Sequence, residues 1–484
     1  MFLRPLISLS LLVAAPALAQ PSLQDQSAAA AASAPQGTRL GVLVVDDTGR
    51  EVLAINPDGR FVPASNTKLF TTAAAYAVLP GMVQPDAAGG ARVALSAGEG
   101  GDVWLIGGGD ARLSSAPDCA ADCLSVLADA VAAHTRRVGD VIGDDSIWPD
   151  QRWPAGMSWN NIGHDSGTAV SALTLDDNHM VIAARPSAVG APPVVTASPY
   201  YRLRNEAVTI PAGGRMTLVA EHEVNGLELR LRGEIPADAK GWRDVIGIDD
   251  PAHFAAWTLK TMLEARGVVV TGSVRAVHAA PGPDDGPRAS ARAMPRAASI
   301  GAALPQLARL VPPPLAGDVV TINKRSQNLH AQLLFRRLGA AAGSGSEARS
   351  AEAVGDVIAA LGVPRSSYDL SDGAGMSSYN RVSPRTVVSL LRWGAAQPWG
   401  KDWRASFPVG GVDGTLARRF AGSPLQGRVW AKTGTVNGTS ALSGYLLAAS
   451  GRELTFSILA NDVPDGASAL GAIDALLLRI AAAN

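Results

Sequence analysis

The sequence has little cysteine, little lysine and almost no net charge, and these shortages exclude several classes of function. It contains two cysteines, no C-x-x-C pair and no H-E-x-x-H motif, so we expect no metal site and no cofactor. The formal net charge of −1 gives no electrostatic basis for binding nucleic acid. Beyond the N-terminus, no stretch approaches the roughly 18 uncharged apolar residues of a membrane-spanning helix. With 47% hydrophobic residues, the 484-residue chain can form more than one domain.

The N-terminal segment has the pattern of a secretory signal peptide. Arg4 precedes a mostly apolar run at residues 6–15, and Ala17-Leu18-Ala19 follows it. This order predicts a signal peptide at residues 1–19, cleaved after Ala19, and a periplasmic mature protein. Residues 20–36 are expected to form a flexible leader. A membrane anchor is the alternative, but the apolar run is too short to span a bilayer.

The two cysteines, Cys119 and Cys123, can form a disulfide if the protein is exported to an oxidising compartment. Their spacing closes only a small loop, so the bond would stabilise the fold modestly. Two free thiols are the alternative that the sequence leaves open.

Three short motifs, far apart in the chain, carry the candidate chemistry. Ser65 and Lys68 bound a Ser-x-x-Lys motif, Ser326 and Asn328 bound a Ser-x-Asn motif, and Lys432 begins Lys-Thr-Gly. A serine hydroxyl is a poor nucleophile at neutral pH and needs a neighbouring base. Because residues i and i+3 share one face of a helix, Lys68 can lie beside Ser65.

Each motif alone has an ordinary explanation: a helix N-cap at Ser65, a surface helix at Ser326 and an exposed strand end at Lys432. The shortage of lysine makes the combination specific. Of six lysines, only Lys68 has a serine three residues before it, and only Lys432 begins Lys-Thr-Gly. The ordered set is typical of penicillin-interacting serine acyltransferases.

The two ends of the chain together predict one sheet. Five strands are expected, at residues 38–46, 51–56, 429–436, 440–449 and 452–461. A helix is expected at residues 467–483. These strands can share an antiparallel sheet only if the chain ends pair, so the catalytic domain should be discontinuous in sequence.

A large insertion separates the motifs, because Lys68 and Ser326 are about 260 residues apart. Residues 90–278 are rich in short alternating strands, and residues 278–298 form a loop-like exit. Residues 304–315 and 328–337 are then predicted to be helical or loop segments of the catalytic domain.

With these motifs, the chain resembles the D-alanyl-D-alanine carboxypeptidase/endopeptidase family, the class C low-molecular-mass penicillin-binding proteins. The similarity covers nearly the whole mature chain. It lies in residues 63–69, 102–110, 171–173, 326–328, 371–377, 412–416 and 431–435. The Asp-Gly-x-Gly run from Asp372 and the Asp-Gly-Thr-Leu run from Asp413 are more particular to the family than the three short motifs.

The resemblance implies an α+β fold. It would contain a penicillin-binding/β-lactamase-like transpeptidase domain, with a five-stranded antiparallel sheet and flanking helices, and nested, mostly-β inserted domains. We expect the catalytic domain at residues 37–82 and 299–484, inserted domain II at 83–98 and 170–298, and inserted domain III at 99–169.

The family's residue roles then become expectations for this sequence. Ser65 would be the acylated nucleophile and Lys68 its base. Ser326 would pass a proton to the leaving amine, and Asn328 would hold the substrate amide.

The resemblance also implies how the substrate would be held. Lys432 with Thr433 would face its carboxylate, and the backbone N–H groups of Ser65 and Thr435 would form the oxyanion hole. The partners would be peptidoglycan muropeptides that end in D-Ala-D-Ala or carry D-Ala-diaminopimelate cross-links, with β-lactams as covalent inhibitors.

One departure from the family concerns the stem peptide. Relatives often carry an acidic residue shortly after a Trp, where it meets the amino group of diaminopimelate. Here Trp159 is followed by Asn161, and Asp165 lies a few residues further on. Asn161 and Asp165 are therefore candidates for stem-peptide recognition; the alternative for Asp165 is a solvated loop carboxylate.

Two other functions compete with this prediction. A serine β-lactamase shares Ser-x-x-Lys and Lys-Thr-Gly, but the long insertion argues against it. A non-catalytic sensor or cell-wall binding protein could keep the fold, but the intact motifs argue against a dead site.

Overall fold

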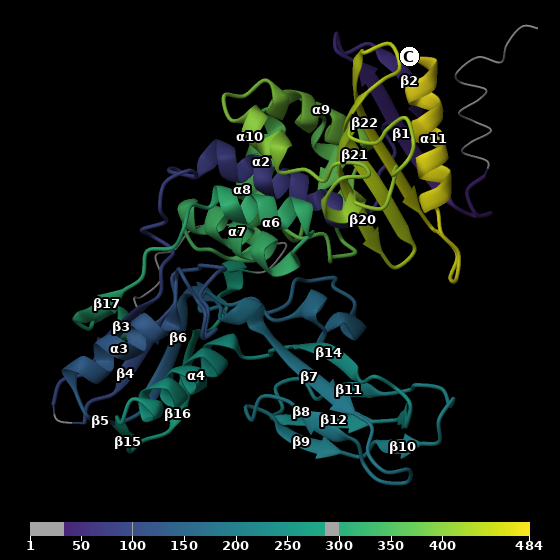
Figure 1. The fold of residues 1–484 in the computed structure, drawn as a ribbon. Helices are drawn as coiled ribbons and strands as arrows, with labels where there is room; N and C mark the ends of the chain where they lie inside the picture. Colours follow the sequence, from purple (N-terminus) through teal and green to yellow (C-terminus); the bar gives the residue numbers. More distant parts are fainter. Residues whose placement is uncertain (1–32, 99, 286–299) are drawn as a thin grey trace, which may run out of the picture.

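Figure 1 shows a computed structural model of the chain, which describes residues 33–98, 100–285 and 300–484. The predicted signal peptide and the leader up to residue 32 lie outside the described residues. In the described part, no helix is both long enough and apolar enough to cross a membrane.

The predicted five-stranded antiparallel sheet is confirmed, with the strand order β2-β1-β22-β21-β20. Its strands are β1 (Arg39–Asp46), β2 (Glu51–Ile55), β20 (Val429–Val436), β21 (Thr439–Leu447) and β22 (Glu453–Asn461). The chain ends meet where β1 pairs with β22, from Arg39 opposite Asn461 to Asp46 opposite Leu454. β20 is the edge strand of this sheet.

Helices cover both faces of this sheet (Figure 1). They are α2 (Thr67–Val78), α6 (Ala316–Lys324), α7 (Asn328–Ala341), α8 (Glu347–Ala359), α9 (Pro384–Ala395), α10 (Gly400–Ala405) and α11 (Leu470–Ala483). Neighbouring strand residues point to opposite faces. Leu442 therefore joins the core under α11, whereas Ala441 joins the core under α2 and α7. The short strands β18 (Tyr368–Asp369) and β19 (Arg381–Val382) pair beside these helices.

The insertion forms a second α/β unit and a smaller group of strands below the helices (Figure 1). The larger sheet has the order β16-β6-β4-β3-β17. Its strands are β3 (Arg92–Leu95), β4 (Val103–Ile106), β6 (Val141–Pro149), β16 (Val274–Ala279) and β17 (Gln306–Arg309). Four more elements accompany it, namely α3 (Leu124–His134), α4 (Pro251–Ala265), β5 (Arg137–Val138) and β15 (Val269–Val270); a short helix, α5 (Ile300–Ala303), precedes β17.

The smaller group consists of short sheets. They contain β7 (His179–Arg185), β8 (Val194–Thr196), β9 (Arg202–Asn205), β10 (Val208–Ile210), β11 (Val219–His222), β12 (Glu228–Arg232), β13 (Glu234–Pro236) and β14 (Trp242–Gly247). The structure also has a disulfide between Cys119 and Cys123, in the loop before α3.

Two sequence-based expectations about the insertion differ from the structure. Residues 304–315, predicted as helix or loop, include strand β17, which pairs with β3. The larger sheet also joins β3 and β16 from the expected domain II to β4 and β6 from the expected domain III. The boundaries at residues 98, 169 and 298 therefore cut through one hydrogen-bonded sheet. We propose instead that the smaller group of strands is the innermost inserted unit.

Candidate active site

Ser65 lies in a single 3₁₀ turn, η1 (Ala64–Asn66), directly before α2. The preceding residue, Ala64, has a φ of 48°, a left-handed conformation that is costly for a residue with a Cβ. Strand β20 packs against this turn at Gly434. A Cβ at position 434 would lie 2.8 Å from the carbonyl oxygen of Pro63 and 3.1 Å from the backbone nitrogen of Ser65. The glycine of Lys-Thr-Gly therefore lets the strand approach the nucleophile.

Lys68, one turn into α2, lies beside Ser65 and is fully buried. Its Nζ is 2.8 Å from Ser65 Oγ, 2.7 Å from Asn328 Oδ1 and 2.6 Å from the carbonyl oxygen of Ala374. Burial lowers the pKa of Lys68 to about 7, although the negative charge of Asp372 raises it. At neutral pH a large share of Lys68 is therefore uncharged.

A neutral amine matches these three neighbours. It has two N–H donors and one lone pair, whereas an ammonium group has three donors and no lone pair. The oxygens of Asn328 and Ala374 can only accept, so they take the two N–H groups. The lone pair is then left facing the hydroxyl of Ser65.

The Ser-x-Asn motif precedes and opens α7, across the cleft from Ser65. Ser326 has a φ of 61°, and its Oγ accepts a hydrogen bond from Lys432 Nζ at 2.9 Å. Asn328 Nδ2 donates to the carbonyl oxygen of Ser166, which lies in the inserted part of the chain, at 2.8 Å. Asn328 thus contacts both Lys68 and the insertion.

An ion-pair network around the buried His330 fastens α7 near this motif. His330 Nδ1 lies 3.0 Å from Asp318 Oδ1 on α6, and His330 Nε2 lies 2.8 Å from Asp177 Oδ1 in the insertion. Burial lowers the pKa of His330, but the hydrogen bonds to Asp177 and Asp318 outweigh it and raise the pKa to about 9. The cationic ring therefore holds the insertion against the helix that carries Asn328.

The Lys-Thr-Gly motif lies on β20, with its lysine pointing inward. Lys432 is fully buried, and burial together with the charge of Lys68 lowers its pKa well below the usual range. Thr433 Oγ1 lies 2.7 Å from Thr415 Oγ1, a residue of the Asp-Gly-Thr-Leu run. Thr435, two residues further along the strand, is exposed. Beyond Ala431, whose N–H donates to the carbonyl oxygen of Pro408, the outer edge of β20 thus offers backbone groups to an extended peptide.

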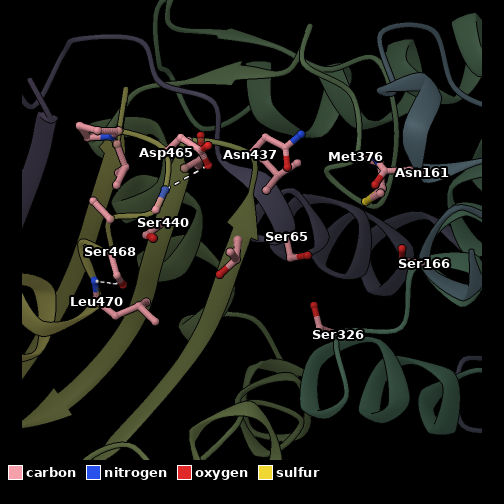
Figure 2. A pocket seen from close by; sticks show the side chains of 18 of the residues that line it. Ser65, Asn161, Ser166, Ser326, Met376, Asn437, Ser440, Asp465, Ser468 and Leu470 are labelled. Carbon is pink, nitrogen blue, oxygen red and sulfur yellow. Dashed lines mark hydrogen bonds between the residues drawn. The ribbon is translucent and has the colours of Figure 1, made fainter. Parts of the chain in front are cut away.

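These residues meet at a cleft of about 570 Å³. Of the residues predicted from the sequence, the structure places Ser65, Ser326, Asn328, Thr435 and Asn161 in its lining. Lys68 and Lys432 lie behind the lining, in contact with Ser65 and Ser326. In Figure 2, Ser65 lies mid-view, with Asn161, Ser166 and Met376 on one side and Asp465, Ser440 and Ser468 on the other.

The structure separates the two candidates for stem-peptide recognition. Asn161 lines the cleft, whereas Asp165 does not, and its Oδ1 instead accepts from the backbone N–H of Ser166 at 2.6 Å. Sequence reasoning missed Asn437 and Asp465, which line the far part of the cleft. Asp465 is the one charged side chain in that lining. Its only signal in the sequence is a loop after the last strand, which does not reveal its position.

Comparison with known proteins identifies the class of this site. The chain belongs to the D-Ala-D-Ala carboxypeptidase 3 (S13) family, whose model matches residues 23–482. The predicted family, fold class and enzyme class, a serine-type D-Ala-D-Ala carboxypeptidase, are confirmed.

Several relatives are similar to the chain over most of its length. A D-alanyl-D-alanine carboxypeptidase of Actinomadura sp. (strain R39) is 34% identical, over 99% of this chain and 89% of the relative. The D-alanyl-D-alanine carboxypeptidase DacB of Haemophilus influenzae is 24% identical, over 89% of this chain and 87% of the relative. The crystal structure of penicillin binding protein 4 (dacB) from H. influenzae has a TM-score of 0.77 at 20% identity, covering 93% of this chain and 97% of that chain.

Proposed function

We propose that the chain is a peptidoglycan DD-peptidase that works through an acyl-enzyme on Ser65, with Lys68 as the general base. The observation that carries the proposal is the arrangement around the Lys68 amine. Its two N–H groups have acceptors, and its lone pair faces the hydroxyl of Ser65. The pKa of about 7 favours a base at neutral pH.

In the acylation step, the hydroxyl proton of Ser65 moves to Lys68 as Oγ bonds to the carbonyl carbon of the penultimate D-Ala. The developing oxyanion would accept hydrogen bonds from the backbone N–H groups of Ser65 and Thr435. As the C–N bond breaks, Ser326, which accepts a hydrogen bond from Lys432 at 2.9 Å, gives its proton to the leaving amine, and the proton that Lys68 took from Ser65 replaces it. Asn328 would hold the substrate amide.

Deacylation reverses these transfers with water in place of the amine. Water loses a proton as it attacks the ester, and the oxygen of Ser65 leaves with a proton. A D-Ala-D-Ala terminus and a D-Ala-diaminopimelate cross-link differ only in the leaving amine. The same machinery therefore serves carboxypeptidase and endopeptidase cleavage, and both belong to the proposal.

The substrate's carboxylate would lie near Lys432 and Thr433, and its peptide would extend along the free edge of β20. We also propose that β-lactams acylate Ser65. The penicillin binding protein 4 of H. influenzae has been crystallised in complex with a β-lactam, and that structure matches this chain with a TM-score of 0.70. The pattern of residues 1–19 supports export to the periplasm, where peptidoglycan is found.

Fluorescent penicillin labelling tests the assignment of the nucleophile. Ser65→Ala should abolish the covalent band on a denaturing gel, because it removes the attacking oxygen. Ser450→Ala, in the turn between β21 and β22, is the matched control and should label like the wild type. A band that persists in Ser65→Ala would refute the assignment.

The same reagent separates a peptidase from a serine β-lactamase. A tethered penicillin leaving group blocks the path of water to the ester, whereas released D-Ala leaves it open. We therefore expect an acyl-enzyme that lasts many minutes beside brisk release of D-Ala from muropeptides. Many penicillin turnovers per minute would favour the β-lactamase. Mass spectrometry of monomeric and cross-linked muropeptides gives the balance between the two peptidase activities.

A further inference from the structure

The Asp-Gly-x-Gly run contains a buried carboxylate that the mechanism above does not use. Asp372 is completely buried. Its Oδ1 accepts from the backbone N–H of Gly375 at 2.8 Å and from Asn380 Nδ2 at 2.6 Å. Its Oδ2 accepts from the backbone N–H groups of Met376 and Ser377 at 2.8 and 2.9 Å. Four donors on one carboxylate fix the shape of the loop.

This loop presses on both the nucleophile and its base. The carbonyl oxygen of Ala374 accepts a hydrogen bond from Lys68 Nζ at 2.6 Å. Gly375 has a φ of 89°, and a Cβ there would lie 1.9 Å from the carbonyl oxygen of Ala64 and 2.9 Å from the nitrogen of Ser65. The loop therefore supports the left-handed residue before the nucleophile and supplies one of the acceptors of Lys68.

The polar and titratable groups near Lys68 belong to several elements. On β20 the neighbour is Lys432, and on α7 it is the neutral Asn328. Asp372 is the negative group whose charge acts on Lys68. Behind it, on α8, burial raises the pKa of Glu347 to about 7, which the charge of Arg336 opposes and that of Asp372 reinforces.

We propose that Asp372 is a positioning residue for acylation, holding residues 372–377 against Ser65 and Lys68 and placing a negative charge near the Lys68 amine. The proposal rests on the proposed role of Lys68 as the base. It assigns a function to a carboxylate of the family-specific run that does not itself line the cleft.

The test is the pH profile of penicillin acylation in Asp372→Asn. The amide keeps the size of the side chain but removes its charge. Without that charge Lys68 loses its proton more readily, so the acid limb of the profile should move about one pH unit or more to lower pH. The plateau rate should also fall at least tenfold, because the loop loses acceptors that order it.

Asp46→Asn is the matched control. Asp46 is also buried and holds a tight turn, accepting from Thr48 and Arg50, but it lies at the end of β1 outside the cleft. Its substitution should leave the acid limb in place. An unmoved limb in Asp372→Asn would overturn the electrostatic role, and an unchanged plateau would overturn the positioning role.

A second variant covers the case in which Asp372→Asn does not fold. Asn380→Ala removes one donor to Asp372 and keeps the charge, so the plateau should fall while the acid limb stays at its wild-type pH. Acylation at the wild-type rate in Asn380→Ala would refute the proposal. A wild-type profile with no acid limb would instead refute the role of Lys68.

Discussion

Acylation of Ser65 should fail on acidification at the pH where Lys68 takes up a proton. With its usual pKa of 10.5, only about one lysine in 3,000 would be neutral at pH 7. Burial lowers the pKa to about 7, so about half is neutral there. The pseudo-first-order rate of penicillin acylation should be half-maximal near pH 7 and fall about tenfold per pH unit below it. Stopped-flow mixing or timed gel labelling measures this rate.

Two results would refute this reasoning. A half-maximal rate near pH 4 to 5 would identify a carboxylate as the base. A half-maximal acylation rate above pH 9 would mean that burial does not lower the pKa of Lys68. Measurements should extend to pH 10, since the prediction includes a flat profile above about pH 8, where almost all Lys68 is neutral.

The same pKa also makes a prediction about stability. Between about pH 7 and 10.5, unfolded Lys68 binds a proton that folded Lys68 does not, so the free energy of unfolding should rise with pH in this window. The slope for the wild type should exceed that for Lys68→Met by up to about 1.4 kcal/mol per pH unit. Lys401→Met, at an exposed lysine, is the control and should keep the wild-type slope. Equal slopes of unfolding free energy against pH in the wild type and in Lys68→Met would contradict the lowered pKa of Lys68.

Three further predictions concern the rest of the molecule. Lys432→Ala should lower kcat/KM on D-Ala-terminated peptides roughly tenfold to a hundredfold, because the substrate carboxylate loses a hydrogen-bond donor; an unchanged value would remove Lys432 from the site. Replacing both Cys119 and Cys123 by Ser should leave kcat within about twofold, because the bond closes a short loop in the insertion, and two alkylatable thiols in unreduced protein would disprove the bond. Asp465→Asn should lower kcat/KM roughly two- to fivefold for muropeptides with a free side-chain amine and leave acetylated ones unaffected. Asp462→Asn is its control, since that carboxylate pairs with Arg39 outside the cleft lining.

The sequence predicts the catalytic sheet well because its strands carry strong local patterns. All five strands pair with a neighbour in sequence, β1 with β2 and β21 with both β20 and β22, and turns such as the one at Ser450 mark these hairpins. Boundaries differ by a few residues, as for α11, which begins at Leu470 rather than residue 467. The inserted sheet was not predictable in this way, because β4 and β16 both pair in parallel with β6 across long connections.

The active site likewise contains residues that a local sequence pattern predicts and residues that it does not. Ser65, Lys68, Ser326 and Lys432 carry recognisable spacing, and the fold brings them together. Asp465 has no such signal, since its loop follows β22 and reaches the cleft through packing, whereas Asn437 lies in the turn directly after β20, just beyond the Lys-Thr-Gly motif. The location of Asp165 depends on one backbone turn, which directs its carboxylate to the N–H of Ser166. Side-chain direction in a short turn is set by contacts that one sequence does not display.

The pairing of β1 with β22 has a consequence for biogenesis. Val62 N–H donates to Asn461 Oδ1, a contact that spans 399 residues. Contacts of such long range form slowly and require the intervening chain to fold or loop out first. Strand β20, which packs against the turn of the nucleophile and carries Lys432, is synthesised long after Ser65. The hydrolase therefore has no assembled site while its chain is incomplete, so the order of synthesis itself delays an activity that attacks the cell wall.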